Sequence, residues 1–157
     1  MERTETRGQR SISPIAIAIV AVLIAIRVVV HFWPEPKSGG VQWVSLEEAV
    51  ELARTSQKPV LMDFTAEWCG PCHILDAEVF RDAEMAKEIN ERFVPVRITD
   101  RMREDGRNSA AVSDLQVRYR VNGFPTVVIA AADGTERERM EGYGGRERFR
   151  RMMENVR

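Results

Sequence analysis

The chain has 157 residues, of which 44% are apolar and 30% are charged, and this length suits one domain of ordinary size. Such a composition is that of a globular protein. The formal net charge of −1 selects no partner by charge, so we expect no nucleic-acid partner.

The first forty residues contain a candidate membrane anchor. Three arginines within the first ten residues precede an apolar stretch, and residues 13–33 number 21, enough to cross about 30 Å of hydrocarbon. Arg27 interrupts this stretch, but it lies past the middle and its side chain can extend toward the interface. We expect a short tail at 1–12, a single transmembrane helix at 13–33 and a linker at 34–40, with the N-terminus in the cytoplasm.

A cleaved export signal is the alternative, with an apolar core that ends at Ile26. No small-x-small cleavage site closely follows Ile26, and this favours an uncleaved anchor in the inner (cytoplasmic) membrane. Both alternatives place the domain of residues 41–157 on the periplasmic or extracytoplasmic side.

Alternating helix and strand patterns fill residues 41–157. Ser45 and Glu48 form a capping box, which predicts a helix start. The apolar run at 60–64 predicts a central buried strand. The first helix is expected to bury one face, which holds Leu46, Ala49, Val50 and Ala53.

The only two cysteines, Cys69 and Cys72, follow this strand in a Cys-x-x-Cys motif. A helical pattern continues to about Val79, so Cys69 is expected at a helix N-terminus, where free N–H groups and the helix dipole favour an anion. A thiol there loses its proton more easily, and the thiolate is the nucleophile. Pro71 suits the first helical turn, because an N–H at that position would have no partner within the helix. Because Cys72 lies on the same side of that turn, the motif predicts a reversible dithiol/disulfide switch.

The second half of the domain continues the alternation. The Asp133-Gly134 pair is a strong hairpin signal. The charged stretch 100–108 is expected to be a polar loop, a solvated insertion to which we assign no role. The other expected elements are a helix capped by Asp82 that buries Met85 and Ile89, a strand at 94–98, a helix at 109–119, a strand starting at Pro125, its hairpin partner at 135–141, and a closing helix striped by Phe149, Met152, Met153 and Val156.

These motifs resemble a known superfamily. Trp-Cys-Gly-Pro-Cys after an Asp-Phe strand, with Phe124-Pro125-Thr126 later in the chain, resembles the thioredoxin superfamily. The entry helix at 43–49, the Phe80-Arg81-Asp82 break and the 142–145 junction are similar to the family of the C-terminal domain of the thiol:disulfide interchange protein DsbD. The resemblance implies a thioredoxin-like α/β fold, with a central mixed β-sheet flanked by helices, here preceded by the transmembrane helix.

Chemistry and resemblance together predict three catalytic residues. Cys69 is expected to be the attacking thiolate, exposed at the helix tip, and Cys72 the resolving thiol that breaks the mixed disulfide. Asp63 is a charge within an apolar strand, and burial raises the pKa of a carboxyl, so it suits a general base. The alternative is a half-buried Asp63 with a backbone partner.

The predicted substrate-binding residues are Trp68, Gly70, Pro71, Phe124 and Pro125. The resemblance implies a cis peptide before Pro125, beside the cysteines, where the adjoining backbone pairs with the substrate chain. From the sequence alone, a trans proline at a strand edge is more common. Trp68 is expected either to form a hydrophobic docking surface or to be a partly exposed packing residue.

His73 extends the motif to the Cys-x-x-Cys-His pattern of haem attachment. The preceding strand, Pro71 and the later Phe124-Pro125 favour redox exchange instead, so we expect no cofactor and no metal. His73 is then expected to stabilise the thiolate when protonated, or to face solvent.

The expected function is thiol:disulfide oxidoreduction that reduces the disulfides of exported proteins. Gly-Pro is the dipeptide of thioredoxin, whose reduction potential is about −270 mV, against about −120 mV for the oxidant DsbA. The expected partners are disulfide-containing proteins and a membrane thiol electron donor. The alternatives are an exported thiol oxidase or isomerase, and a non-catalytic membrane-tethered binding or assembly module.

Overall fold

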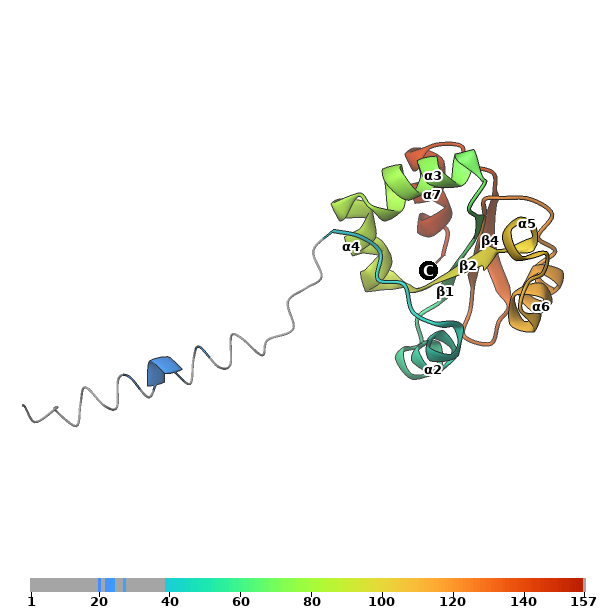
Figure 1. Cartoon of the computed structure of the whole chain (residues 1–157). Coiled ribbons are helices and arrows are strands. Elements are labelled where there is room, and N and C mark those ends of the chain that lie inside the picture. Colours follow the sequence, from blue (N-terminus) through green and yellow to red (C-terminus); the bar gives the residue numbers. More distant parts are fainter. Residues whose placement is uncertain (1–19, 21, 25–26, 28–38, 157) are drawn as a thin grey trace, which may run out of the picture. The chain divides into compact units, whose positions relative to one another are not determined.

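The structure is a computed structural model that describes residues 20, 22–24, 27 and 39–156. The α/β domain is a compact unit within residues 37–157 (Figure 1). The expected tail (1–12), and most of the expected anchor (13–33) and linker (34–40), lie outside the described residues. Over the described positions, no helix combines the length and the apolar character that crossing a bilayer requires.

A mixed four-stranded sheet forms the centre of the domain, in the order β2-β1-β3-β4. β1 pairs in parallel with β2 and antiparallel with β3, and β3 pairs antiparallel with β4 across the expected hairpin. The expected mixed sheet with a buried inner strand is therefore confirmed. The strands are β1 (Val60–Ala66), β2 (Val94–Asp100), β3 (Thr126–Ala130) and β4 (Glu136–Glu141).

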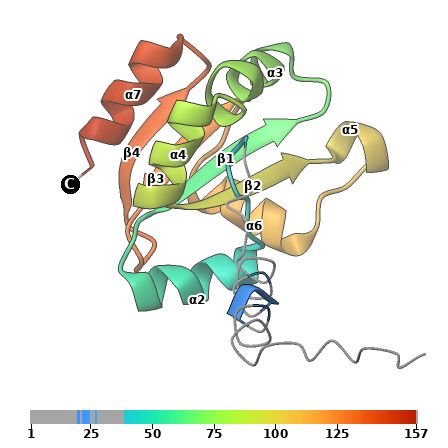
Figure 2. The ribbon, with the colours of Figure 1, turned by 90° about the vertical axis from the view of Figure 1, so that its left-hand side faces the viewer.

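Helices cover both faces of this sheet (Figure 2). On one face lie α3 (Gly70–Leu75), the π-helical turn η1 (Asp76–Phe80), α4 (Ala83–Arg92) and α7 (Arg146–Glu154). On the other face lie α2 (Leu46–Ser56) and α6 (Ala110–Arg118). The helix that was expected to run to Val79 is α-helical only as far as Leu75. It continues as a π-helical turn, in which the Arg81 N–H donates to the Asp76 carbonyl five residues back.

The larger apolar core lies between the sheet and the α3, α4 and α7 helices. Phe80 is at its centre, with ring contacts to Trp43 and Phe149 at 4.9 and 5.7 Å between ring centres. Within α4 and α7 the predicted buried stripes are confirmed, because Met85, Ile89, Phe149, Met152 and Met153 are buried. Val156, the last member of the predicted stripe, lies beyond the end of α7 and is only partly buried. This packing holds α3, and the cysteines at its start, against the sheet.

On the opposite face the predicted buried stripe of α2 is only partly right. Ala49 and Ala53 are buried, but Val50 is 55% exposed. Ala49 and Ala53 are four residues apart and lie on the same side of the helix. Val50 points about 100° away from Ala49 around the helix axis. Since two small alanines let α2 lie close to the sheet, its contact face is narrow and excludes Val50.

The charged stretch 100–108 is more ordered than expected. Residues 101–107 are exposed, as a solvated insertion requires, but they include a short helix, α5 (Met102–Asp105). Asp100 at its base is buried and accepts hydrogen bonds from the side chains of Asn108 and Gln116, at 2.6 and 2.9 Å. The stretch is therefore a structured part of the domain.

Candidate active site

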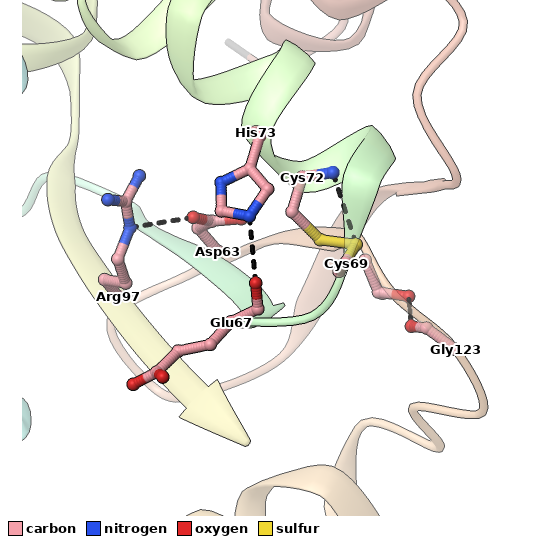
Figure 3. Close-up of a disulfide and its surroundings, with 8 residues drawn as sticks. Asp63, Glu67, Cys69, Cys72, His73, Arg97 and Gly123 are labelled. Carbon is pink, nitrogen blue, oxygen red and sulfur yellow. Dashed lines mark hydrogen bonds and ion pairs between the residues drawn. A yellow bond between two sulfur atoms is a disulfide. The ribbon is translucent and has the colours of Figure 1, made fainter. Parts of the chain in front are cut away.

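A disulfide joins Cys69 and Cys72 at the start of α3 (Figure 3). Cys69 is the N-cap of α3, and its Sγ accepts a hydrogen bond from the Cys72 N–H at 3.2 Å. Pro71 lies in the first turn, where its missing N–H leaves no carbonyl unsatisfied. The predicted sequence of strand, tight turn and helix is confirmed, and it directs the backbone N–H of Cys72 at the sulfur of Cys69.

The expectation that Cys69 is exposed is wrong for this disulfide form. Cys69 is 2% exposed and Cys72 is 5% exposed. They form a small apolar cluster with Ala66, against which Phe124 packs. Apolar side chains therefore pack against the disulfide, while Gly70 and Pro71 between the cysteines remain exposed.

Asp63 lies on β1 and is 2% exposed, so the half-buried alternative is wrong. Its Oδ2 accepts a hydrogen bond from Arg97 Nε at 3.0 Å, and its Oδ1 has no hydrogen-bond partner among the described residues (Figure 3). Burial raises the pKa of the Asp63 carboxyl to about 6, although the charge and hydrogen bond of Arg97 lower it, and the nearby charge of Asp76 raises it further. A carboxyl with this pKa exchanges protons close to neutral pH.

Arg97 is the member of the site that sequence reasoning missed. It stands beside Asp63 in the β1–β2 register and also donates from Nη2 to Asp76 Oδ1 at 2.6 Å. Its guanidinium lies over the Trp43 ring, 4.3 Å from the ring centre. The available signal was the alternation of β2, in which Arg97 is the polar position between two buried ones, Val96 and Ile98. Its pairing with Asp63 can be recognised only from the register of β1 and β2.

Trp68 and Phe124 form an aromatic rim beside the disulfide. Their ring centres lie 5.9 Å apart in an edge-on arrangement, and Trp68 is 45% exposed. The peptide bond between Phe124 and Pro125 is cis, as the resemblance implied. The structure thus brings both predicted aromatic residues and the proline to the neighbourhood of Cys69.

The turn before Cys69 is held by two contacts at Glu67. The His73 ring Nε2 hydrogen-bonds to the Glu67 carbonyl at 2.9 Å, so His73 faces this backbone turn (Figure 3). The exposed Glu67 carboxylate pairs with Arg101 Nη1 at 2.6 Å. The next residue of α3 after His73 is Ile74, an apolar side chain that is 51% exposed and to which no role was assigned from the sequence. Across the described part of the chain, no cluster of three or more His, Cys, Asp or Glu side chains could hold a metal ion.

Comparison with known proteins points to one family. The family model described as a thioredoxin-like domain matches residues 46–157. Thioredoxin 1 of Chlorobaculum tepidum is 32% identical over 79 residues, which cover 50% of this chain and 66% of that protein. The disulfide bond reductase DsbH of Chlamydia pneumoniae is 26% identical over 106 residues, which cover 66% of this chain and 64% of that protein.

A solved structure supports the same assignment. The C-terminal domain of Neisseria meningitidis DsbD in its oxidised form superposes with a TM-score of 0.54 at 26% identity, covering 71% of this chain and 93% of that chain. The two curated relatives are matched over just under two thirds of their own length. Both cysteines, Asp63, Arg97 and the aromatic rim lie within the part of the chain that the family model matches.

Proposed function

The chain belongs to the thioredoxin-like domain family, and on this premise we propose that it reduces the disulfides of proteins outside the cytoplasm. The observation that carries the proposal is the Cys69–Cys72 pair at the start of α3, beside Phe124 and the cis Pro125. The name of one relative, disulfide bond reductase DsbH, favours reduction over oxidation.

Cys69 performs the first chemical step in the reduced protein. Its thiolate attacks one sulfur of the substrate disulfide, forms a mixed disulfide and releases the other substrate sulfur as a thiolate. The free N–H groups at the start of α3 stabilise the Cys69 thiolate before the attack. The Cys72 N–H already donates to the Cys69 Sγ in the disulfide form.

Cys72 performs the second step. It must lose its proton, and its thiolate then attacks the Cys69 Sγ, so that the mixed disulfide breaks and the second substrate sulfur leaves as a thiolate. Asp63 accepts the Cys72 proton, since its pKa of about 6 leaves it mostly ionised at pH 7 yet still basic. Two electrons have then passed to the substrate, and the protein holds its disulfide.

The substrate chain lies against the aromatic rim and the backbone next to Pro125. Trp68 and Phe124 supply apolar contact on one side of the disulfide. Gly70 and Pro71 are exposed, so the substrate chain can approach the disulfide closely at the start of α3. Extended substrate backbone pairs with the residues beside Pro125, as in other cases of strand addition.

We place the domain on the outer side of the cytoplasmic membrane, tethered by residues 13–33. The length of this stretch and the three arginines before it support a single span with a cytoplasmic N-terminus. In an oxidising compartment the disulfide form must be reduced again. Both cysteines of the chain belong to the motif, and we propose that a membrane thiol donor supplies these electrons.

Covalent trapping tests the proposal. In the full-length chain, Cys72→Ala leaves the mixed disulfide unresolved, so exported proteins should remain bound through a bond that dithiothreitol breaks. Cys69→Ser is the matched control and should trap nothing. If function in the cell survived Cys69→Ser, the chain would be a non-catalytic binding module, and the proposal would be wrong.

The reduction potential decides the direction of electron flow. Equilibration of the full-length chain with a dithiothreitol redox buffer should place the Cys69–Cys72 couple near about −270 mV, the value of thioredoxin. A value nearer about −150 mV, between protein disulfide isomerase and DsbA, would support an oxidase or isomerase instead.

A further inference from the structure

The short helix α5 is anchored beside the active site. Asp100 holds the start of α5 in place. Arg101 pairs with Glu67 at 2.6 Å, and Glu67 lies two residues before Cys69 in the chain. Arg101 also pairs with Asp105 within the same segment, at 2.6 Å. The donors to the Asp100 carboxylate are the Met102 N–H at 3.1 Å, the Asn108 amide at 2.6 Å and the Gln116 amide at 2.9 Å.

Arg103 extends from α5 onto the aromatic rim. Its guanidinium carbon lies 3.7 Å from the centre of the Trp68 ring. Trp68 directly precedes Cys69 in the chain. Its ring contacts the Phe124 ring, with 5.9 Å between ring centres. A positive charge therefore stands over the ring that flanks the attacking sulfur, a favourable cation–π position.

The guanidinium of Arg103 has no ion-pair partner among the residues that the structure describes. Within the described part of the chain, no carboxylate oxygen lies within 4.0 Å of its guanidinium nitrogens, whereas Arg101 has two carboxylate partners. A guanidinium that stacks on a ring still presents its N–H groups in its own plane, where a carboxylate can bind with two hydrogen bonds. Arg103 is thus an exposed cation over the Trp68 ring, and its guanidinium pairs with no described carboxylate.

We infer that Arg103 selects substrates that carry an aspartate or glutamate next to the cysteine of the disulfide to be reduced. The inference rests on the proposed function, because it names the substrate class of the same site. The neighbouring dithiol reacts with cysteine-bearing chains, so the anion that reaches Arg103 during the reaction is a side chain of such a protein segment. A lysine at the same place in the substrate is repelled.

Peptide reduction tests this inference. The full-length protein is reduced, freed of reductant and mixed with three disulfide-linked peptides that differ only in the residue next to the reactive cysteine, which is Glu, Gln or Lys. The second-order rate constant of reduction is measured at about 50 mM and about 500 mM NaCl, since high salt screens an exposed ion pair.

The wild type should reduce the Glu peptide about three- to fivefold faster than the Lys peptide at low salt, in the upper part of the range for one exposed ion pair. This preference should largely disappear at high salt. Arg103→Gln should bring the ratio of the two rates close to one, and Arg103→Glu should reverse the preference.

Arg107→Glu is the matched control, because it makes the same charge change in the same exposed segment. Arg107 lines a cleft with Thr99 and Val112, to which neither ring of the rim contributes. The variant should keep the wild-type preference. The inference is wrong if Arg103→Glu keeps that preference, if it slows all three peptides equally, or if Arg107→Glu removes the preference too. Failure of the wild type to reduce any of the peptides would instead contradict the proposed function itself.

Discussion

Arg97 donates a hydrogen bond from Nε to Oδ2 of the buried Asp63 across 3.0 Å. The same guanidinium donates from Nη2 to Asp76 Oδ1 at 2.6 Å, and Asp76 also pairs with Arg81 at 2.5 Å. Two carboxylates therefore share one cation next to the disulfide. The proton affinity of Asp63 depends on this sharing, because burial and Asp76 raise its pKa while Arg97 lowers it.

Two substitutions should move the pKa of Asp63 in opposite directions. Arg97→Met removes the group that lowers it, so the pKa should rise above about 6. Asp76→Asn removes a negative charge that raises it, so the pKa should fall. Carbon-13 NMR titration of the Asp63 carboxyl in the disulfide form measures both shifts. Asp133→Asn, in the exposed hairpin turn, is the control and should leave the titration unchanged. Shifts of the same sign in both test variants would contradict the opposite effects of Arg97 and Asp76 on the pKa of Asp63.

Asp63→Asn should stabilise the disulfide form at high pH. The folded wild type keeps its Asp63 proton up to about pH 6, whereas the unfolded chain loses it near 3.8, so wild-type stability falls as the pH rises between these values. Asparagine has no proton to lose. At pH 8 the free energy of unfolding should be about 2–3 kcal/mol higher in the variant, and near pH 4 the two should agree. Urea denaturation at both pH values measures this, and a less stable variant at pH 8 would mean that the Arg97 pair outweighs the cost of burial.

The thiol of Cys69 should ionise more easily than an ordinary cysteine. In reduced Cys72→Ala, the rate of alkylation by iodoacetamide should reach half its maximum at a pH below about 8.5, the usual pKa of a cysteine thiol. The reason is the set of backbone N–H groups at the start of α3, which stabilise the anion. The same variant unfolded in urea should titrate near the ordinary value. Equal midpoints in the folded and unfolded protein would exclude activation by the helix.

The base of α5 should depend on Asp100. Burial raises the pKa of its carboxyl, but the hydrogen bonds from Gln116, Asn108 and the Met102 N–H outweigh burial and hold the pKa below its usual value. Asp100→Asn replaces an acceptor oxygen by a donor that faces other donors, which should cost about 1–3 kcal/mol of stability. Hydrogen exchange should become faster at residues 101–108. Asp105→Asn, which changes only an exposed ion pair, should have a much smaller effect on stability, and equal effects would contradict the anchoring role.

The core under α7 should be sensitive to a cavity. Phe149 is fully buried and contacts Phe80, so Phe149→Ala should lower the free energy of unfolding by about 3–5 kcal/mol. Val117 on α6 is 78% exposed, so Val117→Ala should change it by about 0.5 kcal/mol or less. Thermal or urea denaturation of the disulfide form compares the two. A small effect of Phe149→Ala would show that the packing of α7 contributes little.

The sequence by itself determined the elements whose signals are local. The order of strand, dithiol turn and helix follows from an apolar run, two cysteines and Pro71, and the β3–β4 hairpin follows from Asp133-Gly134. These signals act over a few residues, through caps, turn conformations and hydrophobic periodicity, so they can be read from neighbouring positions alone. The anchor at 13–33 remains a prediction of the same kind.

Tertiary structure alone decided the contacts that tune the site. Asp63 and Arg97 lie 34 positions apart and meet because β1 and β2 pair in parallel in one particular register. Arg103 reaches Trp68 because the stretch 100–108, to which no role was assigned from its sequence, is anchored at Asp100. The burial of Cys69 likewise depends on which side chains pack over it. Strand register and desolvation are properties of segments far apart in the chain, and no local pattern encodes which segments will meet.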